Sequence, residues 1–198
     1  MRLAGRPRLN PIRLGAPSTS RMFKIRFPPT EIAHWAARYS FPGEDDLAER
    51  VAPAARDRGY LKRREFLDLC RWKTPRTAKR CALNSSQQIR DATQLSFNTS
   101  DERAKIGILR FLDGVDWPTA SVLLHFCDRQ PYPVLDFRAL WSLGISHPPT
   151  YTFEFWWAYA SFTRQLAASS GESMRTVDRA LWQYSKEHQP PTGRLPSA

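Results

Sequence analysis

The spacing of apolar residues most strongly constrains how this chain can fold. From Pro29 onward these residues recur at the three- and four-residue intervals of amphipathic helices, and no alternating run longer than about four residues indicates a strand. Short loops separate the helical segments. The pattern therefore predicts an all-α fold, a compact helical bundle arranged either as one body or as two lobes.

Several residues mark where the predicted helices begin and end. We expect Thr30 to cap the first helix, and serines to cap the segments that begin at residues 85 and 100. Pro53 should kink or split the helix that stops at Gly59, because proline cannot donate the backbone hydrogen bond of a helix interior.

Size and cysteine content place the chain in a broad class. Its 198 residues suffice for one domain with a core that needs no disulfide, and its three cysteines form no C-x-x-C pair. The longest apolar run is far shorter than the ~20 residues that span a bilayer. We expect a soluble, cytoplasmic monomer with no membrane partner and no metal. The Arg-, Ala- and Pro-rich composition points to the bacterial cytosol or nucleoid.

The charge of the chain indicates a polyanionic partner. The formal net charge is +11, and residues 1–30 carry seven Lys or Arg and no acid, which leaves only +4 for the remainder. We predict a basic Pro/Arg-rich disordered tail over residues 1–29, one domain over residues 30–188, and a second disordered tail over residues 189–198. The first tail is interpreted as a DNA-tethering arm, as an extended start or as a targeting peptide.

Residues 112–120, "LDGVDWPTA", carry the first functional signal. An apolar helix stops at Asp113-Gly114 and another starts at Pro118, while Gly114 and Asp116 suit a tight, left-handed turn. The N–H groups of such a turn and of the following helix point outward together and form an anion site suited to a DNA phosphate. The alternative is an ordinary corner between two helices.

This stretch resembles the L-P-G-V-G-x-x-T-A signature of the helix-hairpin-helix DNA glycosylases, the superfamily that includes endonuclease III. The family has a catalytic aspartate downstream, and "VLDFRALWSLG" supplies Asp136 at 22 residues after Gly114, the separation in the family pattern. The resemblance covers about residues 60–145. It implies that the DNA backbone is bound by Gly114, Val115, Asp116, Trp117 and Thr119.

Base excision is the activity that the resemblance implies. Such enzymes flip one nucleotide of double-stranded DNA into a pocket and cleave its N-glycosidic bond through an oxocarbenium-like state. Asp136 matches the carboxylate that stabilises this cation or activates the attacking water. Its alternative role is to cap the next helix, and both roles can coexist. A non-catalytic helix-hairpin-helix DNA-binding module and an α-helical interaction protein are the rival functions.

Departures from the family pattern narrow the predicted chemistry. Pro118 stands where bifunctional members carry a Schiff-base lysine, so a lyase step through that residue is excluded and we expect a monofunctional glycosylase that leaves an abasic site. No cysteine follows Cys127, so no iron–sulphur cofactor is expected. The only bound ion that remains an open alternative is a monovalent cation at the hairpin. Asp116 replaces the second hairpin glycine, which places an acid close to the expected phosphate.

A second segment, "CRWKTPR", is similar to the part of the family fold that inserts a wedge into DNA. Trp72 or Lys73 would fill the gap left by the flipped base, and Arg76 would hold a phosphate. Lys73 is also the nearest substitute amine for a lyase step. Tyr132 is a candidate for the pocket wall and Arg138 for an ion pair with Asp136. The alternative is a buried tryptophan among solvated cations.

Overall fold

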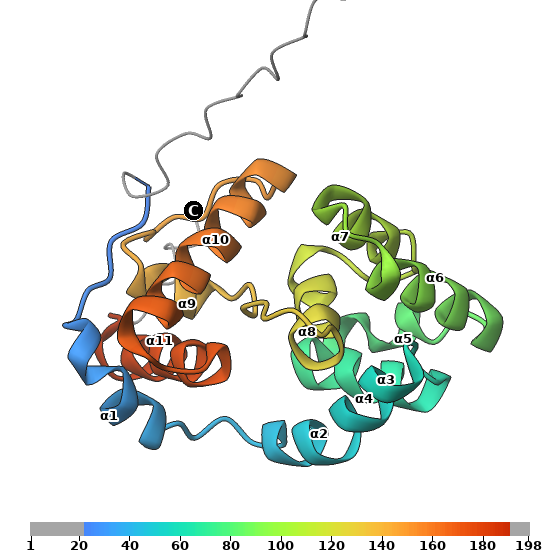
Figure 1. Cartoon of the computed structure of the whole chain (residues 1–198), viewed down its shortest axis with the longest axis horizontal. Helices are drawn as coiled ribbons and strands as arrows, with labels where there is room; N and C mark the ends of the chain where they lie inside the picture. The colour runs from blue at the N-terminus through green and yellow to red at the C-terminus, as the bar shows by residue number, and fades with distance from the viewer. Residues whose placement is uncertain (1–21, 191–198) are drawn as a thin grey trace, which may run out of the picture.

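The computed structural model describes residues 22–190, and the predictions for residues 1–21 and 191–198 fall outside it. The described residues form helices and no strand, so the predicted all-α fold is confirmed. Figure 1 shows the helices in two groups that lie side by side, the second of the two predicted arrangements. We call these groups the terminal lobe and the central lobe.

The terminal lobe combines the two ends of the described chain. Helix α11 packs against α1, α9 and α10, and the short 3-10 helix η2 contacts α1 and α10. The bounds of these elements are η2 Pro29–Glu31, α1 Ile32–Ala37, α9 Phe137–Ser142, α10 Phe153–Ser170 and α11 Met174–His188.

The central lobe contains the helices between these ends. Helices α4 and α8 lie at its middle, with α2, α3, α5, α6 and α7 around them (Figure 1). The bounds are α2 Glu44–Arg50, α3 Ala52–Arg58, α4 Arg63–Lys73, η3 Pro75–Thr77, α5 Ala78–Cys81, α6 Ser86–Asn98, α7 Glu102–Arg110 and α8 Trp117–Cys127.

The domain begins earlier than the predicted boundary at residue 30. Phe23 and Phe27 are 2% and 4% exposed, and the Phe23 ring packs against Tyr159 of α10. Lys24 N donates to Leu143 O over 2.9 Å, which ties this segment to the end of α9. Residues 22–29 therefore belong to the terminal lobe, because two buried phenylalanines anchor a stretch whose charge and prolines had suggested a tail.

The predicted helix ends are confirmed in part. Pro53 lies in the first turn of α3 and separates it from α2, and Ser85 caps α6 by accepting from Gln88 N over 3.2 Å. The caps predicted at Thr30 and Ser100 are wrong. The N-cap of α1 is Glu31, since the 3-10 turn η2 precedes it, and the N-cap of α7 is Asp101, whose carboxylate accepts from Ala104 N.

Candidate active site

A tight turn of residues 111–116 joins α7 to α8, and we call it the α7–α8 turn. Gly114 has a left-handed φ of 77°, and a Cβ there would lie 2.7 Å from Cys81 N. Asn84 fixes the same turn because its side chain accepts from Asp113 N and donates to Asp113 O, both over 2.9 Å. Only glycine fits this close approach of α5 to the turn.

The other residues predicted to bind DNA at this turn differ in exposure. Val115, Trp117 and Thr119 are buried, and the Val115 N–H donates to Leu112 O within the turn over 3.1 Å. Asp116 is exposed, and its φ of −116° is extended, not left-handed as expected. Arg110 pairs with the Asp116 carboxylate over 3.1 Å, which offsets the acid near the start of α8.

A buried ion pair holds α7 in register with the end of α8. Lys105 Nζ lies 2.6 Å from Asp128 Oδ2, and the two side chains are 5% and 2% exposed. Lys105 also donates to Ser96 O of α6 over 3.2 Å. The pair therefore links the two helices that flank the turn to the rest of the central lobe.

Asp136 lies where the chain returns from the central lobe to the terminal lobe. Its Oδ1 accepts from Arg138 N over 2.9 Å, so it caps α9 as expected. Its Oδ2 accepts a hydrogen bond over 2.7 Å from Nζ of Lys73, which is the last residue of α4. The side chains of Asp136 and Lys73 are 19% and 10% exposed, so the pair is largely shielded from bulk water.

The Asp136–Lys73 pair lines a pocket of about 320 Å³ between the lobes. Aromatic side chains from both lobes form its walls. The centroid of the Phe41 ring lies 5.4 Å from that of Trp72 and 5.4 Å from that of Trp182. The volume and the aromatic walls suit a single flat ring, such as a nucleobase that stacks on them. Sequence reasoning had missed Phe41 and Trp182, which come from segments outside the family resemblance.

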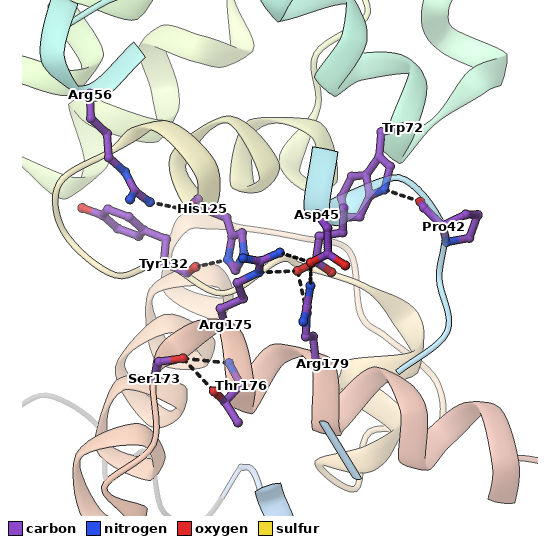
Figure 2. A network of polar contacts seen from close by, with 11 residues as sticks. Pro42, Asp45, Arg56, Trp72, His125, Tyr132, Ser173, Arg175, Thr176 and Arg179 are labelled. Atoms are coloured by element: carbon purple, nitrogen blue, oxygen red, sulfur yellow. Dashed lines mark hydrogen bonds and ion pairs between the residues drawn. The ribbon is translucent and has the colours of Figure 1, made fainter. Parts of the chain in front are cut away.

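The remaining predicted pocket residues divide between this pocket and other places. Trp72 lines the pocket, with its indole N–H donating to Pro42 O over 3.0 Å (Figure 2), while Arg76 is exposed beyond the end of α4. The ion pair expected between Arg138 and Asp136 is not formed. The Arg138 guanidinium instead lies over the rings of Phe137 and Trp182.

Tyr132 lies apart from the Asp136 pocket. Its hydroxyl donates to Glu102 over 2.7 Å and its ring stacks on Trp156, so the side chain is only 1% exposed. It lines a separate pocket of about 290 Å³ beside His125, whose Nδ1 lies 2.7 Å from Tyr132 O. The extended chain between Tyr132 and Asp136 carries the two side chains to different pockets.

Comparisons with protein-family models, with curated proteins and with solved structures gave no match to this chain.

A second carboxyl group, Asp178 of α11, lines the Asp136 pocket. Its Oδ1 accepts from Val134 N over 2.8 Å, two residues before Asp136. Burial raises the pKa of Asp178 from 3.8 to about 8, and the nearby charges of Glu44 and Asp136 add to this effect. The hydrogen bond from the Val134 N–H and the positive charge of Lys73 act in the opposite direction and lower this pKa. The raised pKa favours the protonated form of the Asp178 carboxyl group at neutral pH.

A network of arginines and acids joins α11 of the terminal lobe to α2 of the central lobe. Arg175 and Arg179 of α11 both donate to Glu44 Oε1 of α2 over 2.8 Å, and Figure 2 shows both guanidinium groups also reaching Asp45. Burial opposes ionisation of Glu44, but its hydrogen bonds from the arginines and Tyr39 outweigh this and lower its pKa. These contacts fix the position of the lobes on either side of Asp136.

The described part of the chain offers neither a metal site nor a membrane span. Among residues 22–190, no group of three or more His, Cys, Asp or Glu side chains is arranged to hold a metal ion. Over the same residues, each helix is too short or too polar to cross a bilayer.

Proposed function

We propose that the protein is a monofunctional DNA glycosylase of the helix-hairpin-helix type that excises a damaged or modified base and leaves an abasic site. The observation that carries the proposal is the place of Asp136, at an aromatic pocket between two lobes and 22 residues after the glycine of the α7–α8 turn. A carboxylate beside a pocket for a flat ring is the arrangement that base excision requires.

The chemistry assigned to Asp136 follows from its contacts. Oδ1 is held by the Arg138 N–H and Oδ2 by Lys73, so the carboxylate is fixed in orientation and faces the pocket. In the proposed reaction it stabilises the positive charge that develops on the sugar, or accepts a proton from the water that attacks C1′. Pre-ordered charge of this kind lowers the barrier without reorganisation during the reaction.

DNA binding in this proposal rests on the α7–α8 turn. The first N–H groups of α8 have no carbonyl partner within the helix and carry its positive dipole end, which favours a phosphate. The exposed cations Arg76, Lys79 and Arg80 lie on the segment that packs against the turn, where Gly114 closely approaches Cys81 and Arg80. Binding of double-stranded DNA should therefore weaken steeply with salt.

Mass spectrometry of released bases tests the proposal. The protein and Asp136→Asn would be incubated with duplex DNA that contains alkylated, deaminated, oxidised or phage-type modified bases. We expect wild type to release one class of base, and Asp136→Asn to bind the same DNA with at least 100-fold slower release, on the order of the loss of a general base. Equal binding by both proteins with no release would favour the non-catalytic DNA-binding module.

A lyase activity of Lys73 is a second candidate function, favoured by one observation. Its amine lies 2.7 Å from Asp136 Oδ2 inside the pocket, so a proton acceptor is adjacent to an amine that could attack C1′. Borohydride reduction with DNA that contains an abasic site tests it. A covalent complex formed by wild type and not by Lys73→Gln would establish the lyase step, whereas intact DNA with no complex supports the monofunctional reaction.

A further inference from the structure

The Asp178 carboxyl is the one acid of the pocket that the proposed reaction has not used. It lies on α11, outside the segment that resembles the glycosylases, and it shares the pocket with Asp136 and Lys73. A hydrogen bond from Val134 N to its Oδ1 fixes it beside the extended segment that leads to Asp136. Tyr159 secures that segment further by donating to Val134 O over 2.9 Å.

We propose that Asp178 is the general acid of this site, which protonates a neutral base as it leaves the sugar. The inference rests on the proposed glycosylase function and adds the class of base that the site takes. A neutral base would leave as an anion and needs a proton, whereas a cationic alkylated purine leaves as a neutral molecule without one. A proton donor in the pocket is therefore useful only for a neutral base.

The proposed step conserves atoms and charge. The C1′–N bond breaks with its electron pair on the base, and the proton of the Asp178 carboxyl moves to that base. Water adds its oxygen to C1′ and gives a proton to the Asp136 carboxylate. Asp136 then releases this proton, and Asp178 regains one from solvent, so the net reaction is hydrolysis.

The surroundings of Asp178 favour its protonated form at neutral pH. Its loss of hydration in this partly buried position disfavours the charged form most strongly, and two carboxylates, Glu44 of α2 and Asp136 at the start of α9, act in the same direction. Lys73 of α4 acts against them, but its ammonium is already paired with Asp136. The other titratable or charged groups around it are Tyr39, Arg138, Tyr159 and Arg179.

Two carboxyl groups in one pocket thus have different surroundings. Both are partly exposed, but Asp136 is paired with an ammonium, whereas Asp178 has no cation bonded to it among the described residues. Sites that need both an acid and a base commonly separate the two roles in this way.

Single-turnover rates of base release against pH test the inference. The probes are duplexes with one uracil, hypoxanthine or 8-oxoguanine, which are neutral, or with one 7-methylguanine, which is cationic. We expect release of a neutral base at a rate that falls above about pH 8, where Asp178 loses its proton. Asp178→Asn, which keeps the acceptor for Val134 N, should slow that release by roughly 10²- to 10⁴-fold and remove the alkaline decline.

Controls separate this inference from the proposed function. Asp57→Asn removes an exposed acid of α3 outside the pocket and should leave the pH profile unchanged. Release of a neutral base that Asp178→Asn does not alter, or release of 7-methylguanine alone, overturns the general acid and leaves the glycosylase. No release by wild type from any duplex overturns both.

A measurement on the free wild-type protein covers the case in which Asp178→Asn does not fold. Carbon-13 carboxyl NMR follows the ionisation of each aspartate without DNA. A resonance of Asp178 that titrates near pH 8 supports the inference, and complete ionisation of Asp178 by pH 6 overturns it.

Discussion

Lys73 Nζ lies 2.7 Å from Asp136 Oδ2, and this contact joins the last residue of α4 in the central lobe to the N-cap of α9 in the terminal lobe. The two residues are 63 positions apart in the chain. The same carboxylate caps α9 through its other oxygen. The orientation of Asp136 therefore depends on both lobes, and a change in their relative position would also displace the candidate catalytic group.

The two roles of Asp136 can be separated by comparing Asp136→Ala with Asp136→Asn. Both variants remove the charge that pairs with Lys73, but asparagine caps a helix as well as aspartate does, and alanine does not. We expect the free energy of unfolding of Asp136→Ala, measured by urea denaturation, to be about 1 kcal/mol lower than that of Asp136→Asn. Equal free energies would show that the hydrogen bond to Arg138 N contributes nothing to stability.

Gly114 should tolerate substitution far less than a glycine with a similar backbone and open space. Gly59 has a φ of 78°, and a Cβ added there would have no atom within 4 Å, so Gly59→Ala should cost about 1 kcal/mol for the left-handed backbone alone. Gly114→Ala adds a contact of 2.7 Å with Cys81 N and should cost on the order of 3 kcal/mol. Urea denaturation of both variants measures the difference, and equal losses would contradict the close approach of α5.

The Lys105–Asp128 pair predicts a strong and asymmetric effect of mutation. Lys105→Met leaves the buried Asp128 carboxylate without its cation and should lower the free energy of unfolding by about 3–5 kcal/mol. The double variant with Asp128→Asn should recover part of this loss, because no charge is then left unpaired. Chemical denaturation of the single and double variants checks the pair. Additive losses would mean that the two side chains do not interact.

The sequence predicted those features that depend only on residues close together in the chain. Pro53 splits α2 from α3 and Ser85 caps α6 because each acts within one turn of its own helix. Asp136 was placed correctly at the start of α9 for the same reason. The tail boundary failed because the burial of Phe23 and Phe27 depends on α10 and α11, more than 100 residues away.

The pocket shows the limit of local reasoning more clearly. The sequence indicated Asp136, Trp72 and Lys73 as separate candidates, but the pairing of Lys73 with Asp136 depends on how the two lobes meet. Arg138 was the expected partner because it is near in sequence, yet its side chain stacks on two aromatic rings. No pattern in the sequence distinguishes Asp178, since it is one polar position of an amphipathic helix, and only the structure places it in the wall of the pocket.

The raised pKa of Asp178 predicts how the free energy of unfolding depends on pH. A group whose pKa is higher in the folded protein than in the unfolded chain stabilises the fold at low pH and loses that contribution as pH rises through the folded value. For Asp178 the window runs from about pH 4, its ordinary value, to about pH 8. Within it, the free energy of unfolding of wild type should fall relative to Asp178→Asn by at most about 1.4 kcal/mol per pH unit.

The measurement is urea denaturation of wild type and Asp178→Asn at intervals between pH 4 and pH 9, with the exposed Asp57→Asn as the matched control. Near pH 4 the first two proteins should be about equally stable, because both then carry a neutral side chain that accepts from Val134 N. At pH 9 the variant should be the more stable protein, while Asp57→Asn should show no such trend. A constant difference across the range would mean that Asp178 is ionised in the folded protein at neutral pH, and the pocket would then hold two carboxylates and no proton donor.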